Sequence, residues 1–220
     1  ARENIGDGDV VVAGALFPGH ANQQMEDDGE PDPAILDADL DEQTTIMAEA
    51  GADLAVLEMI TTTHWGRLAT NAAADTGLPV WLGVSQVFLR WDGAPDFIVP
   101  YDPPGDAGEQ VRLILQGVPE GAVEAVAVMH TEIEDVPTAL DGIEPHWNGP
   151  LGSYPHFGRH QAEPPGFVSL PIDPADFAAS AREWVHRGVQ IIGGCCGIGP
   201  EHIKALKEEL PTHIPESTRR

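Results

Sequence analysis

Short apolar runs rich in β-branched residues alternate along this chain with longer stretches whose apolar residues recur at helical spacing. Each short run predicts a buried strand, because a strand covered on both faces is apolar throughout rather than at alternate positions. The predicted strands are 9–16, 53–58, 78–85, 122–130, 149–155 and 189–194. The intervening stretches predict helices at 33–50, 63–76, 108–116, 134–147, 173–188 and 200–210. This strict alternation is typical of an α/β fold with a parallel sheet covered by helices.

Two architectures fit six strand–helix units: an open doubly wound sheet, and a (β/α)8 TIM-type barrel that lacks two of its units. No G-x-G-x-x-G follows the first strand, which removes the main signal for a dinucleotide-binding sheet. No domain linker is visible, so residues 1–220 are expected to form a single domain. A long insertion follows the third strand, and the Pro- and Gly-rich segment after the fifth strand is expected to be a loop.

In both architectures the active site lies at the carboxyl ends of the strands. Polar side chains gather at those ends, and the candidate site residues among them are Glu58, Ser85, His130, Tyr154, Cys195 and Cys196. His156 lies just beyond the end of the fifth strand. His130 and the two cysteines form a Cys2His set that leaves a fourth tetrahedral position open, as in catalytic zinc sites. The alternatives are core packing for the cysteine pair, a hydrogen-bonded loop residue for His130, and a helix cap for Glu58.

Composition excludes several classes of function. The chain carries 36 acidic and 11 basic residues, for a formal net charge of -25, so no binding to nucleic acid or to an anionic membrane is expected. It has no apolar stretch long enough to span a membrane and no signal-peptide pattern, so a cytoplasmic location is expected. The acidic surface suggests a halophilic source, and an ordinary acidic cytosolic protein is the alternative.

Several segments together resemble the homocysteine S-methyltransferase family, the zinc-dependent group that includes betaine- and S-methylmethionine-using enzymes. The most specific is GGCCGIGPEHIKALKEEL at 193–210, which is similar to the family's carboxyl-terminal signature. Moderately specific matches are VVVAGALFPGH (10–20), AGADLAVLEMITTT (50–63), LPVWLGVS (78–85) and GPLGSYPHFG (149–158). The resemblance implies a (β/α)8 barrel of which this chain carries about units three to eight.

The resemblance also implies an activity: zinc-dependent methyl transfer from a sulfonium or quaternary ammonium donor to the thiol of homocysteine, giving methionine. The implied cofactor is Zn²⁺, held by His130, Cys195 and Cys196, and the implied partners are these small-molecule substrates. Glu58 would bind the amino group of homocysteine, with Ser85 and Tyr154 as further substrate-side groups.

Two departures from the family pattern keep other functions open. The family usually has Asn-Cys at the end of the sixth barrel strand, where this chain has Met129-His130. We interpret His130 as a substitute ligand; the alternatives are another thiol methyltransferase or metal-dependent enzyme on the same barrel, and a non-catalytic truncated relative. A barrel without two strands has exposed sheet edges, so low stability, a homo-oligomer and completion by another chain are the expected alternatives.

Overall fold

The computed structural model describes residues 11–17, 33–85, 88–89, 97–98, 106–162, 165–170 and 172–211. Its main sheet has six strands in the order β1-β2-β3-β6-β7-β10. Their bounds are Ala13–Leu16, Leu54–Ile60, Val80–Ser85, Val123–Glu132, Leu151–His156 and Val189–Ile192. Every pairing within this sheet is parallel.

The order of the strands decides between the two predicted architectures. It follows the order of the chain from one edge of the sheet to the other. A doubly wound sheet reverses direction at a switch point, whereas barrel strands are laid down consecutively. The sheet is therefore that of a partial TIM barrel, as predicted, with β1 and β10 at its edges.

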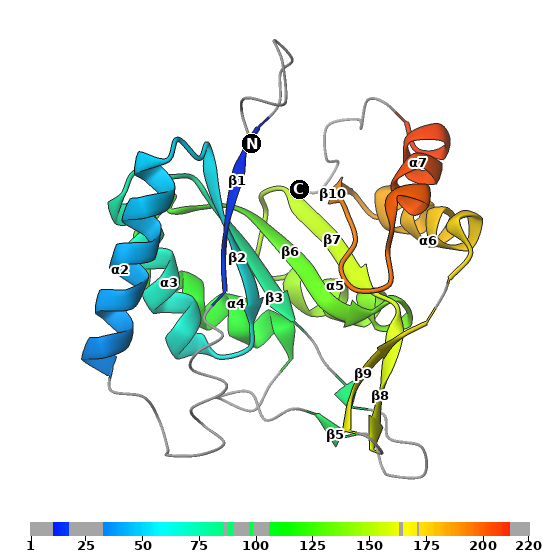
Figure 1. The fold of residues 1–220 in the computed structure, drawn as a ribbon, viewed down its shortest axis with the longest axis horizontal. Coiled ribbons are helices and arrows are strands. Elements are labelled where there is room, and N and C mark those ends of the chain that lie inside the picture. Colours follow the sequence, from blue (N-terminus) through cyan, green and yellow to red (C-terminus); the bar gives the residue numbers. More distant parts are fainter. Residues whose placement is uncertain are drawn as a thin grey trace.

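Helices follow the strands and cover the outer side of the curved sheet. In Figure 1, α2 and α3 lie to the left of the sheet, α4 and α5 behind it, and α6 and α7 to its right. The bounds are Pro33–Glu49, Thr63–Asp75, Ala107–Leu115, Val136–Ile143, Pro174–His186 and Pro200–Glu209. Helix-start signals in the sequence act as expected, since the Asp173 carboxylate accepts a hydrogen bond from the Ala175 amide and Pro174 occupies the first turn.

The core lies on both faces of the sheet. Val126, Ala127, Val128 and Met129 are consecutive in β6, and none is more than 3% exposed. Consecutive burial means that one face of the strand meets the helices and the other meets the barrel interior. The apolar runs in the sequence therefore identified the six strands of the main sheet.

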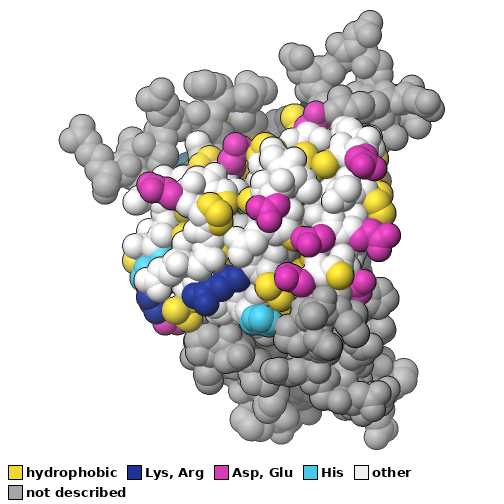
Figure 2. All heavy atoms as spheres, turned by 90° about the vertical axis from the view of Figure 1, so that its left-hand side faces the viewer, with side chains coloured by type: hydrophobic (Ala, Val, Ile, Leu, Met, Phe, Trp, Pro, Cys, Tyr) yellow, Lys and Arg dark blue, Asp and Glu magenta, His cyan; other side chains and the backbone are white. Residues whose placement is uncertain are grey.

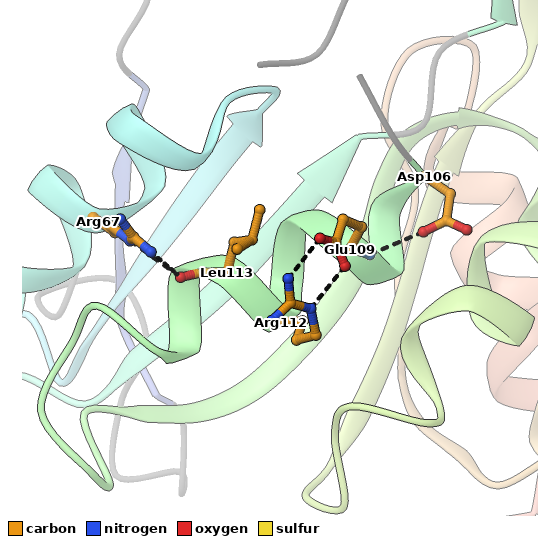
Figure 3. A network of polar contacts seen from close by, with 5 residues as sticks. All are labelled: Arg67, Asp106, Glu109, Arg112 and Leu113. Atoms are coloured by element: carbon orange, nitrogen blue, oxygen red, sulfur yellow. Dashed lines mark hydrogen bonds and ion pairs between the residues drawn. The ribbon is translucent and has the colours of Figure 1, made fainter. Parts of the chain in front are cut away.

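A polar network joins α3 to α4 on the outside of the barrel (Figure 3). The Arg67 guanidinium donates to the carbonyl of Leu113 through Nε at 3.1 Å and Nη2 at 2.6 Å. Asp106 caps α4 by accepting from the Glu109 amide at 2.9 Å, and the Glu109 carboxylate pairs with Arg112. These contacts hold α4 in place. Helix α4 precedes β6, and β6 is the strand that carries part of the candidate site.

Acidic side chains are scattered over the side of the molecule that α2 and α3 form, with few basic groups among them (Figure 2). The excess of acidic over basic side chains on this face agrees with the formal net charge of -25. Within the described residues, no helix combines the length and hydropathy needed to cross a membrane.

One local expectation was wrong, and one helix is shorter than expected. The segment after the fifth predicted strand was expected to be a loop, but β8 (Gly158–Ala162) and β9 (Pro165–Ser169) pair there as an antiparallel hairpin. The helix expected at 134–147 is instead a 3₁₀ turn, Ile133–Asp135, followed by the short α5. The segment after β3 contains a further short pair, β4 (Phe88–Leu89) with β5 (Phe97–Ile98).

Candidate metal and thiol site

The carboxyl ends of β6 and β10 bring three predicted metal ligands together. One ligand atom from each of His130, Cys195 and Cys196 lies within 4.8 Å of the other two. The Cys195 Sγ is 3.8 Å from the Cys196 Sγ and 3.9 Å from the His130 Nδ1. Metal–donor bonds of 2.0–2.3 Å place the donor atoms of a tetrahedral zinc roughly 3.3–3.8 Å apart. The separations of 3.8 and 3.9 Å are close to that requirement, so the residues present fit a zinc ion.

A bulge aims the His130 side chain into this group. The pairing of β6 with β7 shifts register between Met129 and Glu132, and His130 within that shift has a φ of 43°. A bulge turns the backbone locally and redirects a side chain, and positive φ is uncommon for a residue other than glycine. The Thr131 hydroxyl holds the turn by donating to the Met129 carbonyl at 2.8 Å.

Backbone hydrogen bonds fix the two cysteines against the end of β7. The Cys195 amide donates to the Pro155 carbonyl at 2.8 Å, and the Phe157 amide donates to the Cys196 carbonyl at 2.9 Å. Gly197 follows with a φ of 81°, and a Cβ there would lie 2.4 Å from the Phe157 carbonyl oxygen. The glycine is therefore required both for the turn and for the close approach of the two segments.

Burial and the neighbouring Cys196 raise the pKa of the Cys195 thiol to about 11. A thiol with such a pKa is protonated at neutral pH in the metal-free chain. Binding of a divalent cation must therefore displace its proton, because the thiolate is the form that ligates metals.

Glu58 and Tyr154 lie close enough to Cys195 to interact with it electrostatically. Burial raises the pKa of Glu58, and the pKa of Tyr154 is raised by burial and then by the nearby Glu58 and Cys195. The Tyr154 hydroxyl is buried against the bare backbone of Gly83, where a Cβ would lie 2.3 Å from it. Among the described residues this hydroxyl has no hydrogen-bond partner. A buried hydroxyl in that state is suited to a ligand that supplies the missing hydrogen bond.

Ser85, at the end of β3, lies at the same level of the sheet as Tyr154 on β7, with β6 between the two strands. Its register partner on β6 is Met129, whose partner on β7 is Tyr154. The Ser85 side chain is fully buried. The structure thus places all six of the residues expected at the strand ends at the carboxyl-terminal end of the sheet.

Two further residues belong to this site: the sequence placed His156 at a strand end without giving it a role, and it gave no indication of Glu132. The His156 Nδ1 lies 3.2 Å from the His130 Nδ1, and its Nε2 lies 3.1 Å from the Glu132 Oε2. His156 is fully buried and Glu132 is 8% exposed. Each ends its strand. Strand-end position was the signal that located His156 and could have located Glu132, but neither had a partner that could be recognised in sequence.

Comparisons with known proteins identify the family. Residues 1–210 match the family described as Homocysteine S-methyltransferase, and the chain belongs to that family. It is 25% identical over its full length to betaine–homocysteine S-methyltransferase 1 of Danio rerio, covering 55% of that protein. It is 26% identical over 96% of its length to the S-methylmethionine–homocysteine S-methyltransferase BHMT2 of Pongo abelii, covering 57% of it. The chain thus spans about half the length of these curated relatives.

Solved structures support the fold. The chain is similar to the oxidized form of the homocysteine methyltransferase MmuM from Escherichia coli, with a TM-score of 0.63 and 22% identity. This match covers 94% of the chain and 64% of MmuM. The metallated form of MmuM matches with a TM-score of 0.61. These likenesses agree with the partial barrel found here.

Proposed function

We propose that this chain provides the thiol-activating site of a zinc-dependent methyltransferase that methylates homocysteine to methionine. The observation that carries the proposal is the convergence of His130, Cys195 and Cys196 at the carboxyl end of the sheet. Family membership supports homocysteine as the acceptor, and the existence of a metallated form of MmuM supports a metal. The donor is a sulfonium or quaternary ammonium compound, since the named relatives use S-methylmethionine or betaine.

Zinc bound there would supply a Lewis acid that keeps a thiol substrate deprotonated at neutral pH. The residues of the chain then position the substrate. Glu58, which is only partly buried, would accept hydrogen bonds from the ammonium group of homocysteine. The Tyr154 hydroxyl is available to the bound amino acid, and Ser85 borders the same end of the sheet. Holding thiol and donor in line lowers the entropic part of the barrier to transfer.

Methionine formation tests the proposal directly. The zinc-loaded chain is incubated under reducing conditions with homocysteine and, separately, with S-methylmethionine or glycine betaine, and methionine is quantified by mass spectrometry. We expect methionine with at least one donor, loss of product in Cys195→Ser, and full activity in His186→Asn, which alters an exposed histidine of α6. Zinc-loaded protein that yields no methionine above the Cys195→Ser background with either donor contradicts the proposal.

A different thiol acceptor is the second candidate, and the imidazole at position 130 favours it. Replacing a thiolate by a neutral ligand makes the site one unit less negative and so changes the reactivity of a bound sulfur. This candidate predicts zinc binding and methylation of another small thiol without methionine production. A non-catalytic relative predicts neither.

The expectations about nucleic-acid binding, cellular location and self-association are also proposals. We expect no nucleic-acid partner because of the acidic surface, and a cytoplasmic location stays a prediction. Self-association into a homo-oligomer also stays a prediction, and light scattering coupled to size-exclusion chromatography measures it.

A further inference from the structure

The Met129 side chain links two strands of the main sheet that do not pair with each other. Its Sδ accepts a hydrogen bond from the Met59 amide, with 2.8 Å between nitrogen and sulfur. Met59 lies in β2 and Met129 in β6, and β3 separates these two strands in the sheet. The Met129 side chain therefore reaches across the width of β3, and this requires a point on β3 that carries no side chain.

Gly83 of β3 provides that point. A Cβ at this position would lie 3.0 Å from the Met129 Sδ and 2.5 Å from the Leu57 carbonyl oxygen, and it would collide with the Tyr154 hydroxyl. Atoms from β2, β6 and β7 thus converge over one glycine, because only glycine leaves them the space. Tyr154 is one of the candidate substrate-side residues, so the link between Met129 and β2 borders that part of the site.

The hydrogen bond to sulfur holds the peptide group that joins Glu58 to Met59. Within the described part of the sheet, these two residues fall in the register shift of β2 and have no register partner on β1 or β3. Met59 also has a φ of 54°, so the chain leaves the regular strand conformation there. A backbone amide inside the fold needs an acceptor, and the thioether supplies one where the ladder is interrupted. Because a bulge sets the direction of its side chains, fixing this peptide fixes the direction in which Glu58 presents its carboxylate.

We propose that Met129 is a positioning residue that holds the β2 bulge, and with it the Glu58 carboxylate, in the orientation that binds the ammonium group of the acceptor. The inference rests on the proposed function, which assigns the ammonium group to Glu58. A thioether is a weak acceptor, so an amide oxygen of similar reach replaces it and a hydrocarbon does not. Met129→Leu therefore removes the link at nearly unchanged volume, and Met129→Gln restores it.

Two thiols separate positioning from folding, because 4-mercaptobutanoate is homocysteine without its ammonium group. Dissociation constants of both are measured by calorimetry on the zinc-loaded full chain. In Met129→Leu we expect homocysteine to bind about 10-fold more weakly and 4-mercaptobutanoate to bind as in the wild type. We expect wild-type values for both thiols in Met129→Gln and in the control Met47→Leu, which alters a methionine of α2 packed against Gly14. Unchanged homocysteine affinity in Met129→Leu, an equal loss for both thiols, or the same loss in Met129→Gln overturns the inference.

Amide hydrogen exchange, followed by NMR, tests the link without any ligand. We expect the Met59 amide to be protected in the wild type and in Met129→Gln, and to exchange about 10-fold faster in Met129→Leu. If Met129→Leu does not fold, the wild type still decides, because a Met59 amide that exchanges as fast as an unstructured one overturns the inference. The expected exchange pattern in a chain without affinity for homocysteine contradicts only the proposed function. Methionine formation by a chain with an unprotected Met59 amide contradicts only this inference.

Discussion

Glu58 is a partly buried carboxyl group. Its ionised form lowers the stability of the fold, but the same charge is what would bind the ammonium group of homocysteine. Burial raises its pKa above the ordinary value of 4.5. A raised carboxyl pKa means that the folded state binds the proton more tightly than the unfolded chain. Glu58 therefore contributes stability when it is protonated, and this contribution is lost as the pH rises through its folded-state pKa. At neutral pH the ionised group is retained at a cost, as expected of a binding residue.

Glu58→Gln is expected to weaken homocysteine binding without lowering stability. At pH 7 its melting temperature should equal or exceed that of the wild type, and the difference should vanish below pH 4.5, where Glu58 is neutral. Loss of a hydrogen bond between charged groups should weaken homocysteine binding about 10- to 100-fold, measured by calorimetry on the zinc-loaded chain. Glu124→Gln, at an exposed position of β6, is the control. Unchanged affinity in Glu58→Gln contradicts the assignment.

At the scale of elements, bulges at the ends of β2 and β6 shape the site. The register of β2 against β3 shifts between Leu57 and Ile60, where Met59 has a φ of 54°. The equivalent shift in β6 contains His130 with a φ of 43°. Among the described residues these are the two non-glycine positions with positive φ. The Met59 amide also lies 2.8 Å from the Met129 Sδ, so the two bulges are in contact.

A pair of variants at position 130 measures the strain stored in the β6 bulge. Both His130→Ala and His130→Gly remove the imidazole, but only glycine adopts positive φ freely. We expect the glycine variant to be more stable than the alanine variant by about 1 kcal/mol in denaturant unfolding. An alanine variant as stable as the glycine variant would show that the bulge carries no backbone strain.

The elements were predictable to different extents, for identifiable reasons. Strand β6 contains an uninterrupted apolar run at 125–129, and α6 has its cap and terminator in the sequence, so both were located closely. The hairpin at 158–169 was missed because GRHQA and PGFVS lack alternation and β9 begins with Pro165. Proline at the first residue of a strand loses no ladder hydrogen bond. Position at a strand end predicted the three ligand candidates, but the contact between His130 and His156 depends on the bulge, which no sequence pattern signalled.

At the scale of the whole molecule, charge is the dominant feature. The formal net charge of -25 and the acidic face of α2 and α3 in Figure 2 imply self-repulsion in dilute salt. Screening shortens the range of this repulsion from about 10 Å at 0.1 M salt to about 3 Å at 1 M. A halophilic source remains a hypothesis that this property motivates.

Thermal melting in rising potassium chloride tests the hypothesis. Between 0.05 and 1 M we expect the melting temperature to rise by roughly 5 °C, which corresponds to about 2 kcal/mol for a chain of this size. The physical reason is that screening removes repulsion present in the compact state and largely absent from the expanded chain. A melting temperature that is flat or falls over this range contradicts a salt-adapted surface.

The zinc content of the chain purified under reducing conditions tests the central claim most directly, because every step of the account depends on His130 and the vicinal cysteines sharing one ion. Elemental analysis of the wild type should find about one zinc per chain, and Cys195→Ser, with one thiolate fewer, should retain almost none after dialysis. A wild-type chain that is free of zinc after exposure to the metal, or a Cys195→Ser chain that holds as much as the wild type, would contradict the account.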